Sequence, residues 1–256
     1  MLDTILTVFF WGFMTFIVLG LIVRLTEVIF QLVAAVITAL IIAGCIILVI
    51  DGYWMWAIAI GAAGLMASSY LSSNIFKCKL SEFLVNRKLA KLCKNSSNQF
   101  LSDVTIPYKN KTSQIDHVFV SNVGIFVIET KNYSGRIKGR ISDYKWNQRI
   151  GNQSNMFYNP VKQNQTHINA LSSITLYEGI PFVNVVVFVK SNFSISDEAG
   201  SPWQIVTALK HLDEKLTSFK GNMLSADEIS TIVKGIESVR LPPGKDTNKI
   251  HLQNLR

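Results

Sequence analysis

Apolar residues are concentrated in the first 75 positions, where three long runs follow one another closely. Residues 5–23 carry no formal charge, and neither do residues 28–50, which are interrupted by Gln31. A third, weaker run follows at 53–71. About 20 consecutive apolar residues suffice for a helix to span a bilayer. We therefore predict an all-α transmembrane hairpin or bundle over residues 1–75, with spans at about 5–23, 28–50 and 53–71.

The few charges near these runs predict how the chain is oriented. Arg24 lies in the first turn, Asp51 lies in the second, and several Lys and Arg residues follow the third run. Because cytoplasmic loops carry an excess of Lys and Arg, we expect a multi-pass protein of the cytoplasmic (inner) membrane whose C-terminal domain is in the cytoplasm. Two spans, with the third run lying along the interface, give the same location for that domain. Small residues within the runs fit packing inside one chain and a homo-oligomer equally well.

Beyond residue 75 the pattern becomes that of a mixed α/β domain. Apolar periodicity predicts helices at 80–92, 160–177, 206–216 and 225–239, the first with Leu80, Leu84, Leu89 and Leu92 facing inward. Short apolar runs predict strands at 101–106 (ended by Pro107), 115–120, 125–131, 136–141 and 183–190. Ser225 and Glu228 have the spacing of a capping box for the last helix. We expect a mixed sheet flanked by helices over residues 76–241, then a flexible basic tail at 242–256.

Charge divides the chain in the same place. The whole sequence has 25 Lys and Arg against 17 Asp and Glu, but the first 75 residues hold only one of the basic residues and three of the acidic ones. The remainder is strongly basic, which favours a polyanionic partner, either nucleic acid or an anionic membrane surface. Cys45, Cys78 and Cys93 have neither zinc-site nor disulfide spacing.

Three charged residues lie inside otherwise apolar strands, where they are costly unless paired or bound to a metal. They are Asp116, Glu129 and Lys131. A hairpin closed by two or four residues around 122–123 pairs positions whose numbers sum to 245, so Asp116 would stand opposite Glu129 on one face. A three-residue loop would instead place Asp116 on the wrong face.

Two opposed carboxylates repel each other unless a cation lies between them, and oxygen ligands suit Mg²⁺ or Mn²⁺. Lys131, two residues from Glu129 on the same face, could neutralise a phosphate or orient the attacking water. This is the apparatus that phosphodiester hydrolysis needs. The competing interpretation is an Asp/Lys salt bridge on an exposed face, and the residues alone leave the two about equally favoured.

Several sequence blocks, in order, resemble the nuclease-related domain (NERD), a branch of the PD-(D/E)xK nuclease superfamily. The blocks are 81–85 around Glu82, with Ser81 where the family usually has glycine; 113–117 around Asp116; 124–135 around Glu129-Thr130-Lys131; Trp146; and 159–167 with Gln163 and His167. The resemblance implies a restriction-endonuclease-like fold, Asp116 and Glu129 as metal ligands, and Lys131 as the catalytic lysine. It also implies supporting catalytic roles for Glu82 and Gln163.

The residues alone give plainer alternatives for three of these positions. Glu82 at a helix start would also complement the helix dipole. Gln163 could equally be a surface residue. His117 alternates away from Asp116 and is therefore interpreted as structural, and His167 has no partner that the sequence identifies.

A basic stripe follows this signature. Arg136, Lys138 and Arg140 alternate along one strand, and Lys145 and Arg149 lie just beyond. Such a stripe can bind phosphates without reading bases, although a solvated face is also compatible with it.

We therefore expect a membrane-anchored, Mg²⁺- or Mn²⁺-dependent nuclease acting on DNA, or on RNA, at the cytoplasmic face. Such an enzyme would meet foreign DNA that enters there, which suggests a role in defence. The alternatives are a catalytically silent, membrane-tethered nucleic-acid-binding or scaffold protein, and a helical oligomer or pore regulated by the domain.

Overall fold

The computed structural model describes residues 32, 36, 39–47, 50–51, 53–174, 179–196 and 203–242 of the 256-residue chain. The chain divides into two compact units, residues 1–73 and 74–256, which are described separately. The predicted tail at 242–256 lies almost entirely outside the described residues.

The first unit contains helix α2, Trp54–Ser72, which coincides with the third predicted span. Residues 39–47 are also helical. Within the described residues, no helix has both the length and the apolar character required to cross a membrane. The first predicted span, 5–23, lies outside the described residues, as does part of the second.

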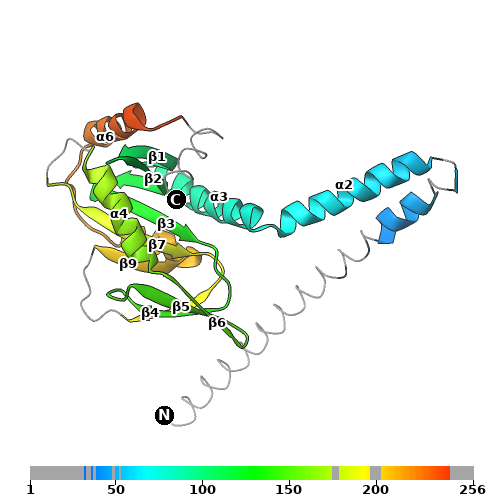
Figure 1. Cartoon of the computed structure of the whole chain (residues 1–256). Helices are drawn as coiled ribbons and strands as arrows, with labels where there is room; N and C mark the ends of the chain where they lie inside the picture. Colours follow the sequence, from blue (N-terminus) through cyan, green and yellow to red (C-terminus); the bar gives the residue numbers. More distant parts are fainter. Residues whose placement is uncertain are drawn as a thin grey trace, which may run out of the picture. The chain divides into compact units, whose positions relative to one another are not determined.

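The second unit is built on a five-stranded mixed sheet with the order β1-β2-β3-β7-β9 (Figure 1). Its strands are β1 Gln99–Tyr108, β2 Lys111–Ser121, β3 Gly124–Lys131, β7 Phe182–Phe188 and β9 Gln204–Ala208. Strands β1, β2 and β3 pair antiparallel, whereas β3, β7 and β9 pair parallel. Strand β7, predicted at 183–190, is buried along nearly its whole length and is apolar except for Asn184, as is usual for a parallel strand covered on both faces.

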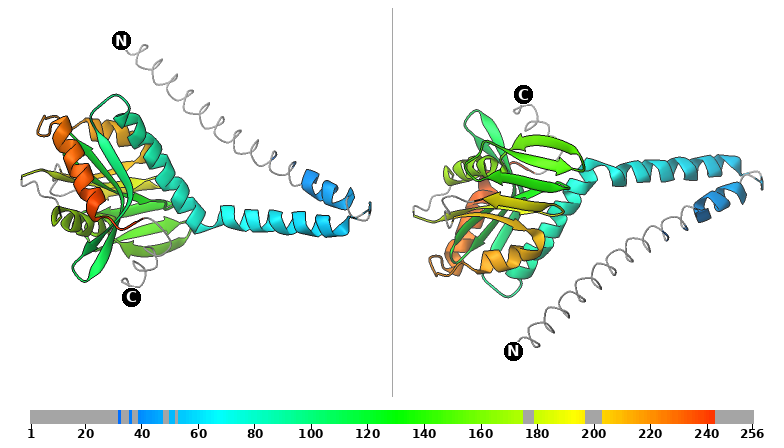
Figure 2. Two further views of the ribbon diagram at one scale, coloured as in Figure 1. Left: turned by 90° about the horizontal axis from the view of Figure 1, so that it is seen from above. Right: turned by 90° about the horizontal axis from the view of Figure 1, so that it is seen from below.

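Helices cover both faces of this sheet. Alternate residues of β3 enter different cores: Phe126 and Ile128 pack with helices α3 and α5, whereas Ile125 and Val127 pack with α4 and α6. The four helices are α3 Asn74–Cys93, α4 Pro160–Ser172, α5 Leu212–Thr217 and α6 Ala226–Val239. The views in Figure 2 place α3 and α6 on opposite sides of the sheet.

A second, four-stranded sheet has the order β6-β5-β4-β8. Its strands are β4 Arg136–Arg140, β5 Lys145–Ile150, β6 Gln153–Tyr158 and β8 Asn192–Ser196. One face of this sheet carries Ile137 and Trp146, which pack with Val186 and Phe188 of β7. The expected mixed α/β architecture is thus present, but with two mixed sheets in place of the predicted one.

The structure corrects several predicted elements. Residues 145–158, for which no element was predicted, form the β5–β6 hairpin. The helix predicted at 206–216 is instead strand β9, a 3₁₀ turn and the short helix α5. Pro107 does not end its strand. Strand β1 is at the edge of the sheet, so no strand lies on its outer side to which the missing N–H of Pro107 would have to donate.

The predicted helix at 80–92 begins earlier, at Asn74, and the residues it buries are Ser81, Val85 and Leu89. Leu80 is exposed and Leu84 and Leu92 are partly buried, so the inward face is rotated from the predicted one. The capping box of α6 is present as predicted.

Candidate active site

The β2–β3 hairpin has the register that was predicted to bring Asp116 to Glu129. Pairs run from Ser121 opposite Gly124 to His117 opposite Ile128, so paired positions sum to 245. The turn is closed by two residues, and Gly124 lies so near Pro181 that a Cβ would be 2.5 Å from the proline carbonyl oxygen. Beyond the ladder, the backbone N–H of Thr130 donates to Asp116 Oδ2 at 2.7 Å. The three-residue loop is therefore excluded.

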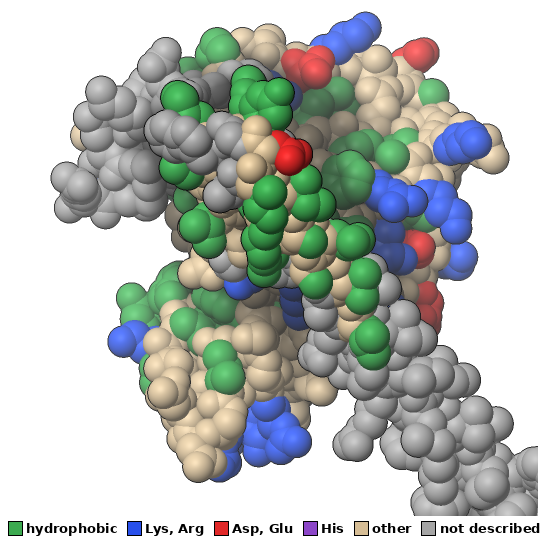
Figure 3. Space-filling model, turned by 90° about the vertical axis from the view of Figure 1, so that its right-hand side faces the viewer, with side chains coloured by type: hydrophobic (Ala, Val, Ile, Leu, Met, Phe, Trp, Pro, Cys, Tyr) green, Lys and Arg blue, Asp and Glu red, His purple; other side chains and the backbone are tan. Residues whose placement is uncertain are grey.

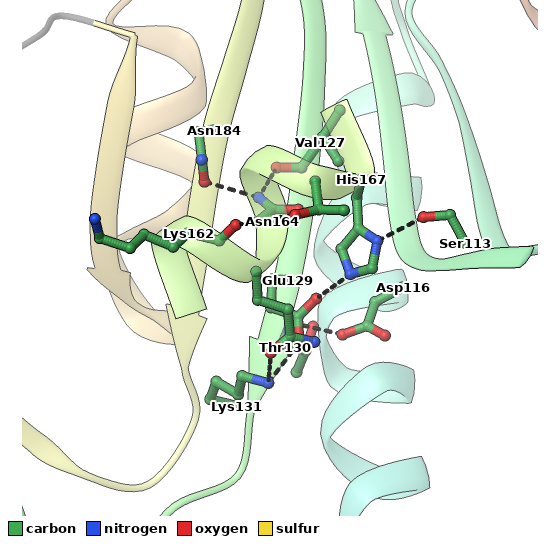
Figure 4. Close-up of polar contacts among 12 residues, drawn as sticks. Ser113, Asp116, Val127, Glu129, Thr130, Lys131, Lys162, Asn164, His167 and Asn184 are labelled. Atoms are coloured by element: carbon green, nitrogen blue, oxygen red, sulfur yellow. Dashed lines mark hydrogen bonds and ion pairs between the residues drawn. The ribbon is translucent and has the colours of Figure 1, made fainter. Parts of the chain in front are cut away.

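Glu129 is buried and lies at the centre of a polar cluster (Figure 4). Lys131 Nζ donates to Glu129 Oε1 at 2.6 Å, and Gln163 Nε2 donates to the same oxygen at 2.9 Å. Lys131 Nζ also donates to Gln163 Oε1 at 2.9 Å. The carboxylate, the ammonium and the amide thus form a closed triangle, and Gln163 faces the site, not solvent.

His167 joins the cluster from the next turn of α4. Its Nε2 lies 3.5 Å from Glu129 Oε2, and its Nδ1 is hydrogen-bonded to Ser113 Oγ at 2.8 Å. The first distance is long for a good hydrogen bond. We did not predict a partner for His167, although its position four residues after Gln163 places both side chains on one helix face.

Burial and charge drive the two carboxyl groups in opposite directions. Burial raises the pKa of Asp116 well above its usual value, and the charge of Glu129 raises it further. Burial would also raise the pKa of Glu129, but the charge of Lys131 and the contact with His167 lower it to about 2. Glu129 is therefore the more acidic member of the pair, and a cation bound between the two would lower the pKa of Asp116.

Glu82 reaches the same cleft from the middle of α3, not from a helix start, so the predicted dipole interaction is wrong. Burial raises the pKa of Glu82, and the charge of Asp103 adds to this effect. The cleft has a volume of about 620 Å³ and contains Glu82, Asp116, Glu129, Gln163 and His167 among its lining residues. The structure therefore brings together Glu82, Asp116, Glu129 and Gln163, four of the five predicted catalytic residues, as lining of one cleft, with Lys131 bonded to two of them.

Helix α4 is held in place by two buried asparagines: Asn164, which belongs to the 159–167 sequence block, and Asn184, to neither of which the sequence assigned a role. Asn164 Nδ2 donates to the carbonyl oxygen of Val127 at 2.8 Å and to Asn184 Oδ1 at 2.9 Å. Asn184 Nδ2 in turn donates to the carbonyl oxygen of Val161 at 2.8 Å. These bonds fix the helix against β3 and β7, and so position Gln163 and His167 beside Glu129.

His117 is structural, as alternation predicted. Its two ring nitrogens bond Asn86 Oδ1 at 3.0 Å and Thr130 Oγ1 at 3.1 Å. Burial lowers the pKa of His117 to about 4.

The predicted basic stripe lies on the second sheet and is not part of the cleft lining. Arg136, Lys138, Arg140 and Lys145 are exposed there, whereas Trp146 is buried. The lower lobe in Figure 3 shows Lys and Arg side chains among polar and apolar ones.

Residues 78–189 match the family model described as NERD, nuclease-related domain. An uncharacterized protein of Bacillus anthracis is 31% identical over 181 residues, which is 70% of this chain and 84% of that protein. This chain belongs to the NERD family. The alignment with the crystal structure of AF1548, a protein of unknown function, covers 67% of this chain and 96% of that one, with 11% identity and a TM-score of 0.31.

The NERD match spans most of α3, β1 to β3, the β4–β6 hairpins, α4 and β7, and so includes every residue of the Asp116–Glu129 cluster. The described residues contain no group of three or more His, Cys, Asp or Glu side chains arranged to hold a metal ion. Mg²⁺, however, commonly takes only one or two protein carboxylates and completes its shell with water and phosphate. Asp116, whose Oδ2 accepts the Thr130 N–H, and Glu129 supply such a pair of oxygen donors, so the cluster fits a divalent cation.

Proposed function

We propose that this NERD protein is a membrane-anchored, metal-dependent nuclease that hydrolyses phosphodiester bonds of DNA. The observation that carries the proposal is the buried cluster in which Asp116 and Glu129 lie together with Lys131 bonded to Glu129. Membership of the family supports a nuclease-like function.

In this proposal Asp116 and Glu129 hold Mg²⁺ or Mn²⁺. The bound ion would lower the pKa of a water molecule and stabilise charge on the scissile phosphate. Burial alone would lower the pKa of Lys131, but the charge of Glu129 and the hydrogen bond to it, with smaller contributions from Tyr133 and Asp116, together raise it, so Lys131 keeps its proton. Its ammonium, fixed by Glu129 and Gln163, can therefore contact a phosphate oxygen or orient the attacking water.

The remaining residues shape and position this site. Gln163 donates to one oxygen of Glu129, and His167 lies 3.5 Å from the other, so both carboxylate oxygens face groups of α4. Glu82 adds a third carboxyl group to the cleft. Lys109 and Lys111, at the turn of the β1–β2 hairpin, also line the cleft and could receive the backbone of the substrate.

The anchor rests on the uncharged runs 5–23 and 28–50. Exposed apolar side chains of α2, including Met55, Trp56, Leu65 and Met66, are consistent with an apolar environment for that helix. We place the domain on the cytoplasmic side of the inner membrane, because Lys and Arg residues follow the third run. There the enzyme would meet incoming phage or plasmid DNA.

The test is a cleavage assay of the full-length chain on supercoiled DNA, linear DNA and RNA, with Mg²⁺ or Mn²⁺ and with EDTA. We expect metal-dependent DNA cleavage that is lost in Asp116→Asn, Glu129→Gln and Lys131→Met. The control is Glu237→Gln, an exposed acid of α6, which should cleave normally. Activity that persists in the Glu129 or Lys131 variant would refute the site. Salt-sensitive DNA binding without any metal-dependent product would favour the alternative of a silent binding protein.

A further inference from the structure

The second sheet carries a basic concavity that is separate from the carboxylate cleft. Its lining consists of Arg136 and Lys138 from β4, Asn147 and Arg149 from β5, Asn152 from the turn and Ser154 from β6. Its volume is about 240 Å³, and none of these residues lines the cleft that contains Asp116 and Glu129.

The register places like charges directly against each other. Arg136 and Arg149 are opposed partners of the antiparallel β4–β5 pair, and Lys138, opposite Asn147, lies two residues along on the same face. Like charges directly opposite each other destabilise a sheet. The residues paired with this set on the neighbouring strands are uncharged: Asn192 and Ser194 on β8, and Ser154 and Met156 on β6. Among the described residues, none of the three cations forms an ion pair.

The fold prevents these side chains from turning away. Ile137 and Trp146 alternate with them, are fully buried and pack against Val186 and Phe188 on the other face. Gly139 is pressed against the ring of Trp146, where an added Cβ would lie 2.3 Å from the indole. The sheet thus holds Arg136, Lys138 and Arg149 together at an electrostatic cost that a bound anion would offset.

The chemistry of the lining indicates the kind of anion. Guanidinium groups bind phosphate oxygens through two parallel N–H bonds, and the amide and hydroxyl groups of Asn147, Asn152 and Ser154 add further polar contacts. The lining contains no apolar side chain that would accommodate an acyl chain and no aromatic ring that would read a base.

We propose that this concavity binds a backbone phosphate of a nucleic acid strand and so holds the substrate away from the cleavage site. The choice of nucleic acid as the polyanion rests on the proposed function. Such a contact strengthens binding without regard to base sequence.

The experiment measures DNA binding by the full-length Glu129→Gln protein in detergent and EDTA, where cleavage is blocked. Fluorescence anisotropy with single-stranded and duplex oligonucleotides is recorded over a range of salt concentrations. In this background, replacing Arg136 and Arg149 by Gln should weaken binding of every sequence by about tenfold. The slope of log K against log salt should fall by about 1 for each phosphate that the protein no longer neutralises. Lys234→Gln, which removes an exposed charge from α6, is the matched control and should change neither quantity.

Thermal unfolding without DNA distinguishes a structural role of Arg136 and Arg149 from a role in DNA binding. Removing opposed like charges should leave Tm unchanged or raise it, and a lowered Tm would contradict the proposal. Unchanged affinity and salt slope would also overturn it, as would arginine-dependent binding to vesicles of anionic phospholipid without binding to DNA. Arginine-dependent DNA binding in a wild-type protein that never cleaves would refute the proposed function but leave this site standing.

Discussion

Replacing Lys131 by Met should strongly destabilise the metal-free domain, because it leaves Glu129 ionised and buried without its cation. The Lys131 and Glu129 side chains are only 15% and 5% exposed and lie 2.6 Å apart. Breaking a buried ion pair by removing one partner costs about 3–5 kcal/mol. Gln163 and His167 remain beside the carboxylate, so we expect the lower end of that range, about 3 kcal/mol.

The pH dependence of this loss has a definite sign. In the wild type the pKa of Glu129 is lowered to about 2, so its ionised form stabilises the fold above its ordinary pKa of 4.5, and this contribution is lost as pH falls toward 2. Without Lys131, burial acts with less opposition and the pKa of Glu129 rises. The difference in unfolding free energy between variant and wild type should therefore be largest near pH 7 and shrink as the pH falls through 4.5 toward 2.

The assay measures urea unfolding of the full-length chain in EDTA, and the hydrogen exchange of the β3 and β7 amides reports on the unfolding of this domain. Adding Glu129→Gln to the Lys131→Met variant removes the orphaned charge and should recover much of the loss, giving a coupling energy of more than about 1 kcal/mol in the double-mutant cycle. A loss below about 1 kcal/mol, or one that does not vary with pH, would refute the ion pair as the basis of the cluster.

Three further changes test other parts of the structure. Asn164→Ala should cost about 1–3 kcal/mol in urea unfolding, since it removes the bonds that fix α4, and should lower kcat through Gln163; normal activity would show that the asparagine does not position the site. In the wild type the pKa of the buried His117 ring is lowered to about 4, so between pH 6.5 and 4 the unfolded chain binds a proton that the folded protein does not, and the unfolding free energy falls on acidification. His117→Gln should remove this dependence and flatten the plot of unfolding free energy against pH over that range. Identical plots for variant and wild type would contradict this. Gly139→Ala should lower the unfolding free energy by about 1–3 kcal/mol through contact with Trp146, and an unchanged Tm would argue against the close packing of the second sheet.

Local rules were sufficient for the centre of the site. The opposition of Asp116 and Glu129 follows from the two-residue turn and the alternation of side chains along β2 and β3, both of which depend on neighbouring residues. The start of α4 at Pro160 and the capping box of α6 are equally local.

Elements that lack a clear pattern of apolar residues were missed. The β5–β6 hairpin is mostly exposed and polar, so it lacks the apolar alternation that marks a strand, although its Gly151-Asn152 turn was a usable hairpin signal. Strand β9 was predicted as helix because its short apolar run continues into α5, and only pairing with β7 decides its conformation.

Within the cluster around Glu129, the positions of the hairpin residues could be predicted from local spacing, but the positions of the residues that the helices contribute could not. Glu82 and His167 belong to helices packed on opposite faces of the sheet, and no spacing within either helix specifies how it docks. For α4 the docking depends on Asn164 and Asn184, polar residues buried where apolar ones are usual. Each donates to backbone carbonyls or to the other asparagine, so an apolar substitute of similar size could fill the space but would not fix the rotation of the helix. The geometry around Glu129 thus depends on residues that never touch it, and the precision of the site is a property of the whole α4–β3–β7 layer.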